Sequence, residues 1–220
     1  MEGHLLDLAR LGAAGMLVVS LTMLTQERLF GLVHLYALHA LLLAAAVALQ
    51  ALAQHAPHLL VTAAVALAVK GLAIPWALHR IVVRLGIHRD LEKVIGAGPT
   101  VLLGLALTVL AVLVVTPPTA GAGALVRQDL AFALAVVLLG LLLMVTRRNA
   151  VSQVIGFTSV ENGLILAAAG ARGMPLVVEF SVAFSVLVAM IVVGIFLFRI
   201  RERFDTVDVH ALDRFRGERP

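Results

Sequence analysis

The chain has 220 residues, of which 61% are hydrophobic and only 14% are charged, and its mean hydropathy is +1.05. A soluble domain cannot bury that much apolar surface, so the composition predicts a polytopic membrane protein. The absence of cysteine excludes disulfides, iron–sulfur ligation by cysteine and thiolate chemistry. The net charge of +4 comes from basic residues at the ends of apolar stretches, so it does not indicate nucleic-acid binding.

Seven apolar stretches are long enough to cross a bilayer as helices. They are residues 8–25, 29–53, 58–84, 100–116, 129–146, 150–170 and 175–199. None of them alternates with the period of a strand, so we expect an all-α fold rather than a barrel. The stretches divide the chain into a four-helix membrane region (1–128), a three-helix region (129–199) and a tail (200–220).

The lysine and arginine residues predict the orientation of the chain in the membrane. The connections after the first, third and fifth spans, together with the tail, carry most of them, and the opposite side holds only Arg10, Arg127 and Arg172. Because basic residues concentrate on the cytoplasmic side, we expect the N-terminus outside, the C-terminus in the cytoplasm and the chain in the inner (cytoplasmic) cell membrane. An even number of spans would bring one basic set to the wrong side, so the charges also favour seven spans.

Glu161 is the main candidate for a functional group. It lies about 11 residues into the sixth span, roughly 16 Å from its start and close to the bilayer midplane. A carboxylate at that depth is costly and usually has a partner, which makes it a candidate proton carrier. The opposite face of the same helix carries the small residues Gly156, Ser159, Gly163, Ala167 and Gly170. We expect another helix to pack closely there and the carboxylate to face a different neighbour. A neutral or hydrogen-bonded glutamate that joins two helices is the other interpretation.

Lys70 lies in the middle of the third span, where its helical face also carries Ala63, Ala66, Ala73 and Ala77. These small residues predict that the lysine faces protein rather than lipid. Pro75 lacks an N–H and frees the carbonyl of Gly71, which loosens the helix beside the lysine. A desolvated lysine can lose its proton reversibly, but a fixed ion pair or bonds to exposed carbonyls would explain the same residue. Glu161 is one candidate partner, although the sequence alone does not pair the two.

The remaining ionisable residues in or beside the spans are weaker candidates. Glu179 lies near the start of the seventh span, where water or the helix dipole can stabilise a carboxylate. His34 and His39 lie about 140° apart around the second span, so they cannot hold one ion together. Either could pass protons or be a buried, hydrogen-bonded histidine. His55 and His58 lack a third ligand, so we predict no metal site and no cofactor site in this chain.

Two motifs and their flanks resemble the HyfE family, the E components of hydrogenase-4 and related membrane-bound hydrogenase complexes. The motifs are GFTSVENGLILAA (Gly156 to Ala168) and GMPLVVEFSVAFSVLVA (Gly173 to Ala189). The flanks are TRRNAVSQ (Thr146–Gln153) and FDTVDVHALDRF (Phe204–Phe215). The resemblance extends from about Leu138 onward, a little over a third of the chain, and the first four spans agree in number and hydropathy only.

The resemblance implies that the last three helices are similar to the NuoK subunit of complex I and to the MrpC antiporter subunit. It implies a non-catalytic membrane subunit that contacts antiporter-like large membrane subunits and a hydrogenase membrane anchor subunit. The [NiFe] site and the iron–sulfur clusters are then expected only in partner subunits. NuoK-like proteins use intramembrane carboxylates for a lateral proton path, and Glu161 falls on the first of them.

The second carboxylate of such a path is not clearly matched. Glu179 lies shallower than a midplane relay requires, and the resemblance implies an aspartate six residues further on, where this chain has Ser185. A serine can hold a water or donate a hydrogen bond, but it cannot store a charge. Either the relay runs from Glu161 to a partner subunit, or the chain couples differently.

The predicted proton path therefore comprises Glu161, Glu179 and Lys70. Secondary candidates are His34, His39 and Ser185. Two alternatives stay open. The chain would be a structural scaffold without proton transfer, or it would be an MrpC-like subunit of a cation/proton antiporter.

Overall fold

The computed structural model describes residues 2–85, 95–121 and 124–170. The helices in these ranges are α1 (Glu2–Thr25), α2 (Leu29–Ala53), α3 (Pro57–Val65), the π-helix η1 (Ala66–Ala73), α4 (Ile74–Leu85), α5 (Ala97–Val115), α6 (Ala124–Thr146) and α7 (Ala150–Gly170). Because α3, η1 and α4 follow one another without a break, they make one span. The described residues therefore hold six helical spans that are long and apolar enough to cross a membrane. The predicted all-α polytopic membrane fold is confirmed.

The first six predicted spans each correspond to a helical span, and several of the helices begin earlier than hydropathy alone indicated. Helix α6 begins at Ala124 rather than at residue 129, because Arg127 and Gln128 extend the helix beyond its apolar part. Helix α5 begins at Ala97, with Pro99 in the first turn, where a missing N–H costs nothing. The predicted seventh span (175–199) and the tail lie outside the described residues, and so do Glu179 and Ser185.

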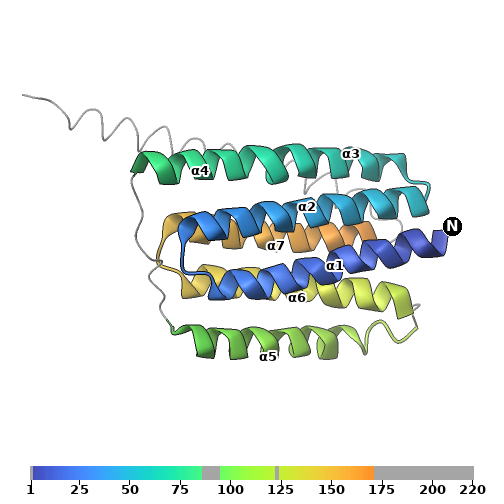
Figure 1. Cartoon of the computed structure of the whole chain (residues 1–220). Helices are drawn as coiled ribbons and strands as arrows, with labels where there is room; N and C mark the ends of the chain where they lie inside the picture. The colour runs from blue at the N-terminus through green and yellow to red at the C-terminus, as the bar shows by residue number, and fades with distance from the viewer. Residues whose placement is uncertain (1, 86–94, 122–123, 171–220) are drawn as a thin grey trace, which may run out of the picture.

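The helices lie side by side as an extended bundle, with α3 and α4 at one edge and α5 at the other (Figure 1). Helix α2 occupies the centre and contacts α1, α3, η1, α4 and α7. Helices α6 and α7 form a tightly packed pair, and α5 packs on α6 and α1. Large apolar side chains point outward around the bundle, including Leu72, Leu102 and Val145, which are 64%, 69% and 76% exposed. This surface is suited to lipid rather than water.

The predicted close approach at the small-residue face of α7 is confirmed, and α6 is the helix that uses it. A Cβ added at Gly140 of α6 would lie 2.8 Å from the Val160 nitrogen and 2.9 Å from the Gly156 oxygen. A Cβ added at Gly156 of α7 would lie 2.9 Å from the Gly140 oxygen, and one at Gly163 would lie 2.9 Å from the Ala133 oxygen. The two backbones therefore touch, and the packing of α7 on α6 leaves the other face of α7 for Glu161.

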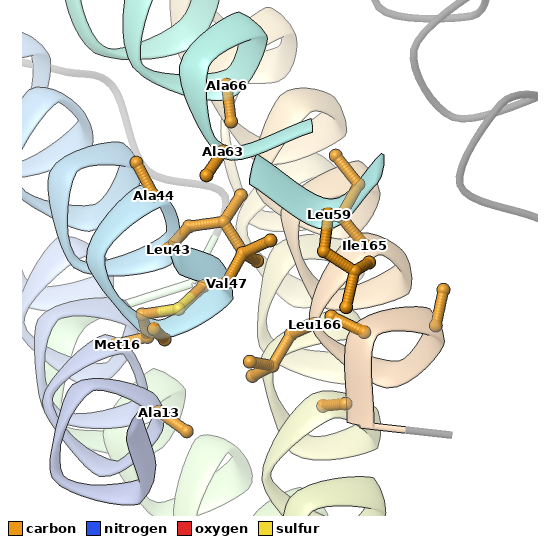
Figure 2. Packing of buried hydrophobic residues seen from close by; sticks show 14 of the residues in the cluster. Ala13, Met16, Leu43, Ala44, Val47, Leu59, Ala63, Ala66, Ile165 and Leu166 are labelled. Atoms are coloured by element: carbon orange, nitrogen blue, oxygen red, sulfur yellow. The ribbon is translucent and has the colours of Figure 1, made fainter. Parts of the chain in front are cut away.

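Two apolar clusters fill the interior of the bundle. The first, here called the Met16 cluster, includes Ala13, Met16, Leu43, Ala44, Val47, Leu59, Ala63, Ala66, Ile165 and Leu166, as Figure 2 shows. The second, here called the Leu32 cluster, includes Met23, Leu24, Leu32, Tyr36, Ile74, Leu78, Val82, Leu139, Leu143 and Ile155. By the predicted orientation, the Met16 cluster lies toward the outside and the Leu32 cluster toward the cytoplasm.

Arg147 fastens the start of the α6–α7 connection to the end of α1. Its guanidinium donates to the carbonyl oxygens of Met23 (3.2 Å), Leu24 (2.9 Å) and Gln26 (2.7 Å), and the side chain is buried. The Met23 and Leu24 carbonyls belong to the last turn of α1, which cannot satisfy them within the helix, and Gln26 directly follows that helix. Burial lowers the pKa of the Arg147 guanidinium, and the negative charge of Glu27 opposes that shift.

Candidate functional site

Lys70 and Glu161 form an ion pair inside the bundle. The Lys70 Nζ lies 3.1 Å from Glu161 Oε2, and the two side chains are only 1% and 2% exposed. The lysine comes from η1 and the glutamate from α7, so the pair joins two spans that are distant in the sequence. An ion pair held out of water gains strongly from its own attraction but needs further hydrogen bonds to offset desolvation.

The π-helix η1 carries Lys70 to this position. Its hydrogen bonds run from each N–H to the carbonyl five residues earlier, as from Ile74 to Val69. It ends at Ala73, and Pro75 follows in the first turn of α4, so the helix beside the lysine departs from α-helical geometry. π-helical segments occur frequently at functional sites, because the wider turn shifts side chains out of α-helical register.

The wider turn also explains an error in the predicted face of this span. Lys70 faces protein as predicted, together with the buried Ala63 and Ala66. Beyond the lysine the prediction is wrong, because Ala73 is exposed and Ala77 only partly buried. The buried face continues instead through Ile74, Leu78 and Ile81. The prediction assumed a continuous α-helix of 100° per residue, and the π-helix breaks that register.

A chain of hydrogen bonds leads from the ion pair across the bundle to α1. Lys70 Nζ donates to Asn162 Oδ1 at 2.8 Å, and Asn162 Nδ2 lies 3.0 Å from His39 Nδ1. The other ring nitrogen, His39 Nε2, lies 3.1 Å from the Ser20 oxygen, and the Ser20 hydroxyl donates to the Met16 carbonyl at 2.9 Å. Residues from η1, α7, α2 and α1 are thereby connected, and all of these polar side chains are buried.

Tyr36 and Thr158 extend the polar site on the side of the Leu32 cluster. Both are 0% exposed, and the Tyr36 hydroxyl lies beside Thr158 and within electrostatic range of Glu161. The Thr158 hydroxyl donates to the carbonyls of Val154 (2.9 Å) and Ile155 (3.1 Å) of its own helix. The environment of Glu161 therefore contains a cation, an amide and hydroxyl groups rather than apolar side chains alone.

The polar groups occupy a layer between the two apolar clusters. One helical turn toward the Met16 cluster from Ser20, His39, Lys70 and Glu161, the residues are Met16, Leu43, Ala66 and Ile165. One turn toward the Leu32 cluster they are Leu24, Leu35, Ile74 and Phe157. A helical turn rises about 5.4 Å, so apolar packing begins directly on both sides of the layer. Within the described residues, and apart from Tyr36 and Thr158, this site is polar along the layer and apolar across it.

Two other histidines singled out in the sequence, His34 and His55, lie away from this site. His34 is exposed on α2; its Nδ1 lies 2.7 Å from the Phe30 carbonyl, and its ring stacks edge-on with His79 of α4 at 6.3 Å between centroids. His55 has a φ of 51° and lies in the turn between α2 and α3, so its backbone closes that turn. In the ranges that the structure describes, no three histidine, aspartate or glutamate side chains gather to hold a metal ion.

Sequence reasoning missed the partners that complete the site, namely Asn162, Tyr36 and Ser20. The available signal was that each is a polar residue inside a long apolar stretch, and Asn162 directly follows Glu161. Arg10 Nη1 lies 2.8 Å from Asp7 Oδ1 within α1. Sequence reasoning also missed Asp129, near the start of α6, whose Oδ1 lies 3.9 Å from Arg10 Nε. That contact fastens α1 to α6 and is separate from the Lys70–Glu161 pair.

The fold and the site define a multi-pass helical membrane protein with an ion pair in its interior. The chain belongs to the family of the uncharacterized protein Rv0085 of Mycobacterium tuberculosis, to which it is 30% identical over 206 residues, or 93% of this chain and 94% of that protein. It is also 32% identical to hydrogenase-4 component E of Escherichia coli K12 and of Shigella flexneri. That similarity extends over 128 residues, 57% of this chain and 59% of those proteins. No family model and no solved structure matches the chain.

These comparisons support the predicted HyfE resemblance in part, because they reach hydrogenase-4 component E over somewhat more than half of each chain. The similarity of the last three helices to NuoK and MrpC stays a prediction.

Proposed function

We propose that this chain is a non-catalytic membrane subunit of a group 4 [NiFe]-hydrogenase-type, complex I-related oxidoreductase complex, in which it supplies part of a lateral proton path through Glu161. The similarity to hydrogenase-4 component E supports the kind of complex. Antiporter-like large membrane subunits and a hydrogenase membrane anchor subunit are its expected partners. The metal and iron–sulfur centres belong to those partners.

The observation that carries the proton path is the buried ion pair in its polar layer. A proton that reaches Glu161 neutralises the carboxylate and weakens its attraction for Lys70, which lies 3.1 Å away. The Lys70 ammonium keeps its hydrogen bond to Asn162 Oδ1 when that happens, so it stays held inside the bundle. When the proton leaves, the ion pair forms again. Lys70 in this scheme is the positive charge that stabilises the ionised carboxylate of Glu161.

The layered arrangement gives the path its direction. Among the described residues, apolar clusters lie one helical turn away on both sides of the site, with Tyr36 and Thr158 as the polar side chains on the side of the Leu32 cluster. This arrangement supports proton exchange across the helices rather than along their axes. The polar groups follow one another across the helices instead. In this proposal, a proton held on Glu161 exchanges in the plane of the membrane with a group of a partner subunit.

The test is Glu161→Gln in the complex purified from its native membrane. We expect normal co-purification of the partner subunits and normal electron transfer, with loss of proton pumping in proteoliposomes. Asp7→Asn is the matched control, because it makes the same chemical change at a carboxylate that is 67% exposed. Unchanged pumping by a fully assembled Glu161→Gln complex would end the proposal.

A second candidate function is structural, and the same ion pair supports it because it ties η1 to α7. A scaffold subunit of this kind would hold its partners together without transferring protons. Glu161→Gln should then lower the yield of the complex, while each assembled complex pumps normally. Cation or proton flux in liposomes that contain only this chain would instead favour an antiporter component.

A further inference from the structure

The donor and acceptor roles in the hydrogen-bonded chain are fixed from the Lys70 end. A lysine ammonium has three donors and no acceptor, so the atom of Asn162 that it contacts at 2.8 Å must be the amide oxygen. The amide nitrogen of Asn162 therefore points to His39 Nδ1, 3.0 Å away, and donates to it. A ring nitrogen that accepts a hydrogen bond carries no proton. His39 Nδ1 is unprotonated while Lys70 is an ammonium.

The Ser20 end gives the same answer independently. The Ser20 hydroxyl has one proton, and it donates that proton to the Met16 carbonyl at 2.9 Å. Ser20 Oγ must therefore accept from His39 Nε2, which lies 3.1 Å away. The proton of the imidazole is thus on Nε2, and both ends of the chain specify the same neutral tautomer.

From this agreement we infer that His39 is a positioning residue and not a proton carrier: it holds the Asn162 amide so that its oxygen faces the Lys70 ammonium beside Glu161. The inference rests on the proposed function of Glu161. The proton path then does not continue through Asn162 to α1, because an amide holds its N–H protons too tightly to relay them.

Protonation of His39 is incompatible with the observed geometry. A proton on Nδ1 would face the Asn162 amide nitrogen, which is itself a donor, so the amide would have to turn and present that nitrogen to Lys70. In the part of the chain that the structure describes, the ionisable groups near His39 and Lys70 are Glu161 on α7 and Tyr36 on α2, and Ser20 on α1 is polar but uncharged. Positive charge at His39 therefore competes with the positive charge at Lys70.

The tautomer can be measured directly on the full chain in lipid nanodiscs, with ¹⁵N-labelled histidine and nitrogen NMR. We expect one buried neutral histidine with a protonated Nε2 and an unprotonated Nδ1, and His39→Asn removes its signals and so assigns them. Asn162→Asp replaces the amide donor with a carboxylate, which only accepts, and should move a proton onto Nδ1. A wild-type His39 protonated at Nδ1, or an unchanged tautomer in Asn162→Asp, would overturn the inference.

A functional comparison separates positioning from relay in the assembled complex. His39→Asn keeps an amide oxygen that can accept from Asn162, whereas His39→Leu offers no acceptor. Positioning predicts that His39→Leu reduces proton pumping roughly tenfold, the effect of one lost hydrogen bond in a chain to a charged group, while His39→Asn reduces it less. A relay through His39 predicts equal loss in both variants, and that result would overturn the inference.

The two proposals fail in different ways. If Glu161→Gln pumps normally, the proposed function falls, and the tautomer of His39 still decides the inference by NMR. If Glu161→Gln stops pumping but His39→Asn and His39→Leu behave alike, the proposed function stands and the positioning role falls.

Discussion

Lys70 on η1 and Glu161 on α7 lie 3.1 Å apart with almost no exposure to solvent, so they form a buried ion pair. Removing one charge of a buried pair leaves the second uncompensated, whereas removing both leaves an apolar contact. We therefore expect Lys70→Met to destabilise the chain by about 3 kcal/mol and the double variant Lys70→Met/Glu161→Met to recover most of that loss. Thermal unfolding in detergent measures both, and a double variant no more stable than the single one would contradict the pairing.

The contact between Gly140 and Gly156 makes a second prediction. Gly140→Ala places a methyl group 2.8 to 2.9 Å from backbone atoms of α7, which cannot move as a side chain can. We expect a loss of about 1–3 kcal/mol in the free energy of unfolding, the usual range for overpacking. Gly98→Ala on α5 is the matched control, because a Cβ there meets no atom within 4 Å. Equal effects of the two substitutions would show that the helices can separate without cost.

Two neighbouring arginines make a third prediction. Arg147 is buried and donates to three carbonyls at the end of α1, whereas Arg148 is exposed. Arg147→Ala leaves those carbonyls without their donor, so we expect a loss of about 2 kcal/mol or more in unfolding free energy. Arg148→Ala removes the same charge and should have little effect. Both variants remove one positive charge from the same connection, so any effect on membrane orientation should be equal. A difference between them in thermal unfolding therefore measures the contribution of the Arg147 hydrogen bonds.

The π-helix before Pro75 makes a fourth prediction. Pro75→Ala supplies the missing N–H and removes the ring that clashes with a continuous α-helix, so it favours α-helical register across Ala66–Ala73. One register step turns a side chain by about 100°, which would move Lys70 away from Glu161. We expect the coupling energy between Lys70 and Glu161, measured by a double-mutant cycle, to fall in the Pro75→Ala background. Pro57→Ala, at the first turn of α3, should leave that coupling unchanged.

The sequence was enough to find the ion pair's members but not the pair itself. Lys70 and Glu161 stand out because a charge inside a long apolar run is rare, and the glycines of α7 predict a close helix neighbour. Which helix packs there, and which carboxylate meets the lysine, depend on how the spans are arranged around α2. Hydropathy does not encode that arrangement.

For a related reason, helical periodicity could not predict the register of the third span or the hydrogen-bond partners in the site. A fixed turn of about 100° per residue places Ala73 and Ala77 on the same helical face as Lys70. The π-helix changes that turn, so the predicted face is wrong beyond the lysine. Asn162 and His39 become partners only because α7 and α2 lie side by side at that level. Their donor and acceptor roles follow once the contacts with Lys70 and Ser20 are known.

The polar layer runs across the helices, with the Met16 cluster on one side and the Leu32 cluster on the other. A membrane voltage falls along the helix axes, and moving a charge through it costs about 2.3 kcal/mol per 100 mV for the full thickness. In the proposed function, a proton that exchanges laterally at Glu161 stays at one depth, so it crosses almost none of that voltage. A membrane voltage would therefore act mainly on the steps that bring protons to this depth or take them away from it, and little on the lateral step at Glu161.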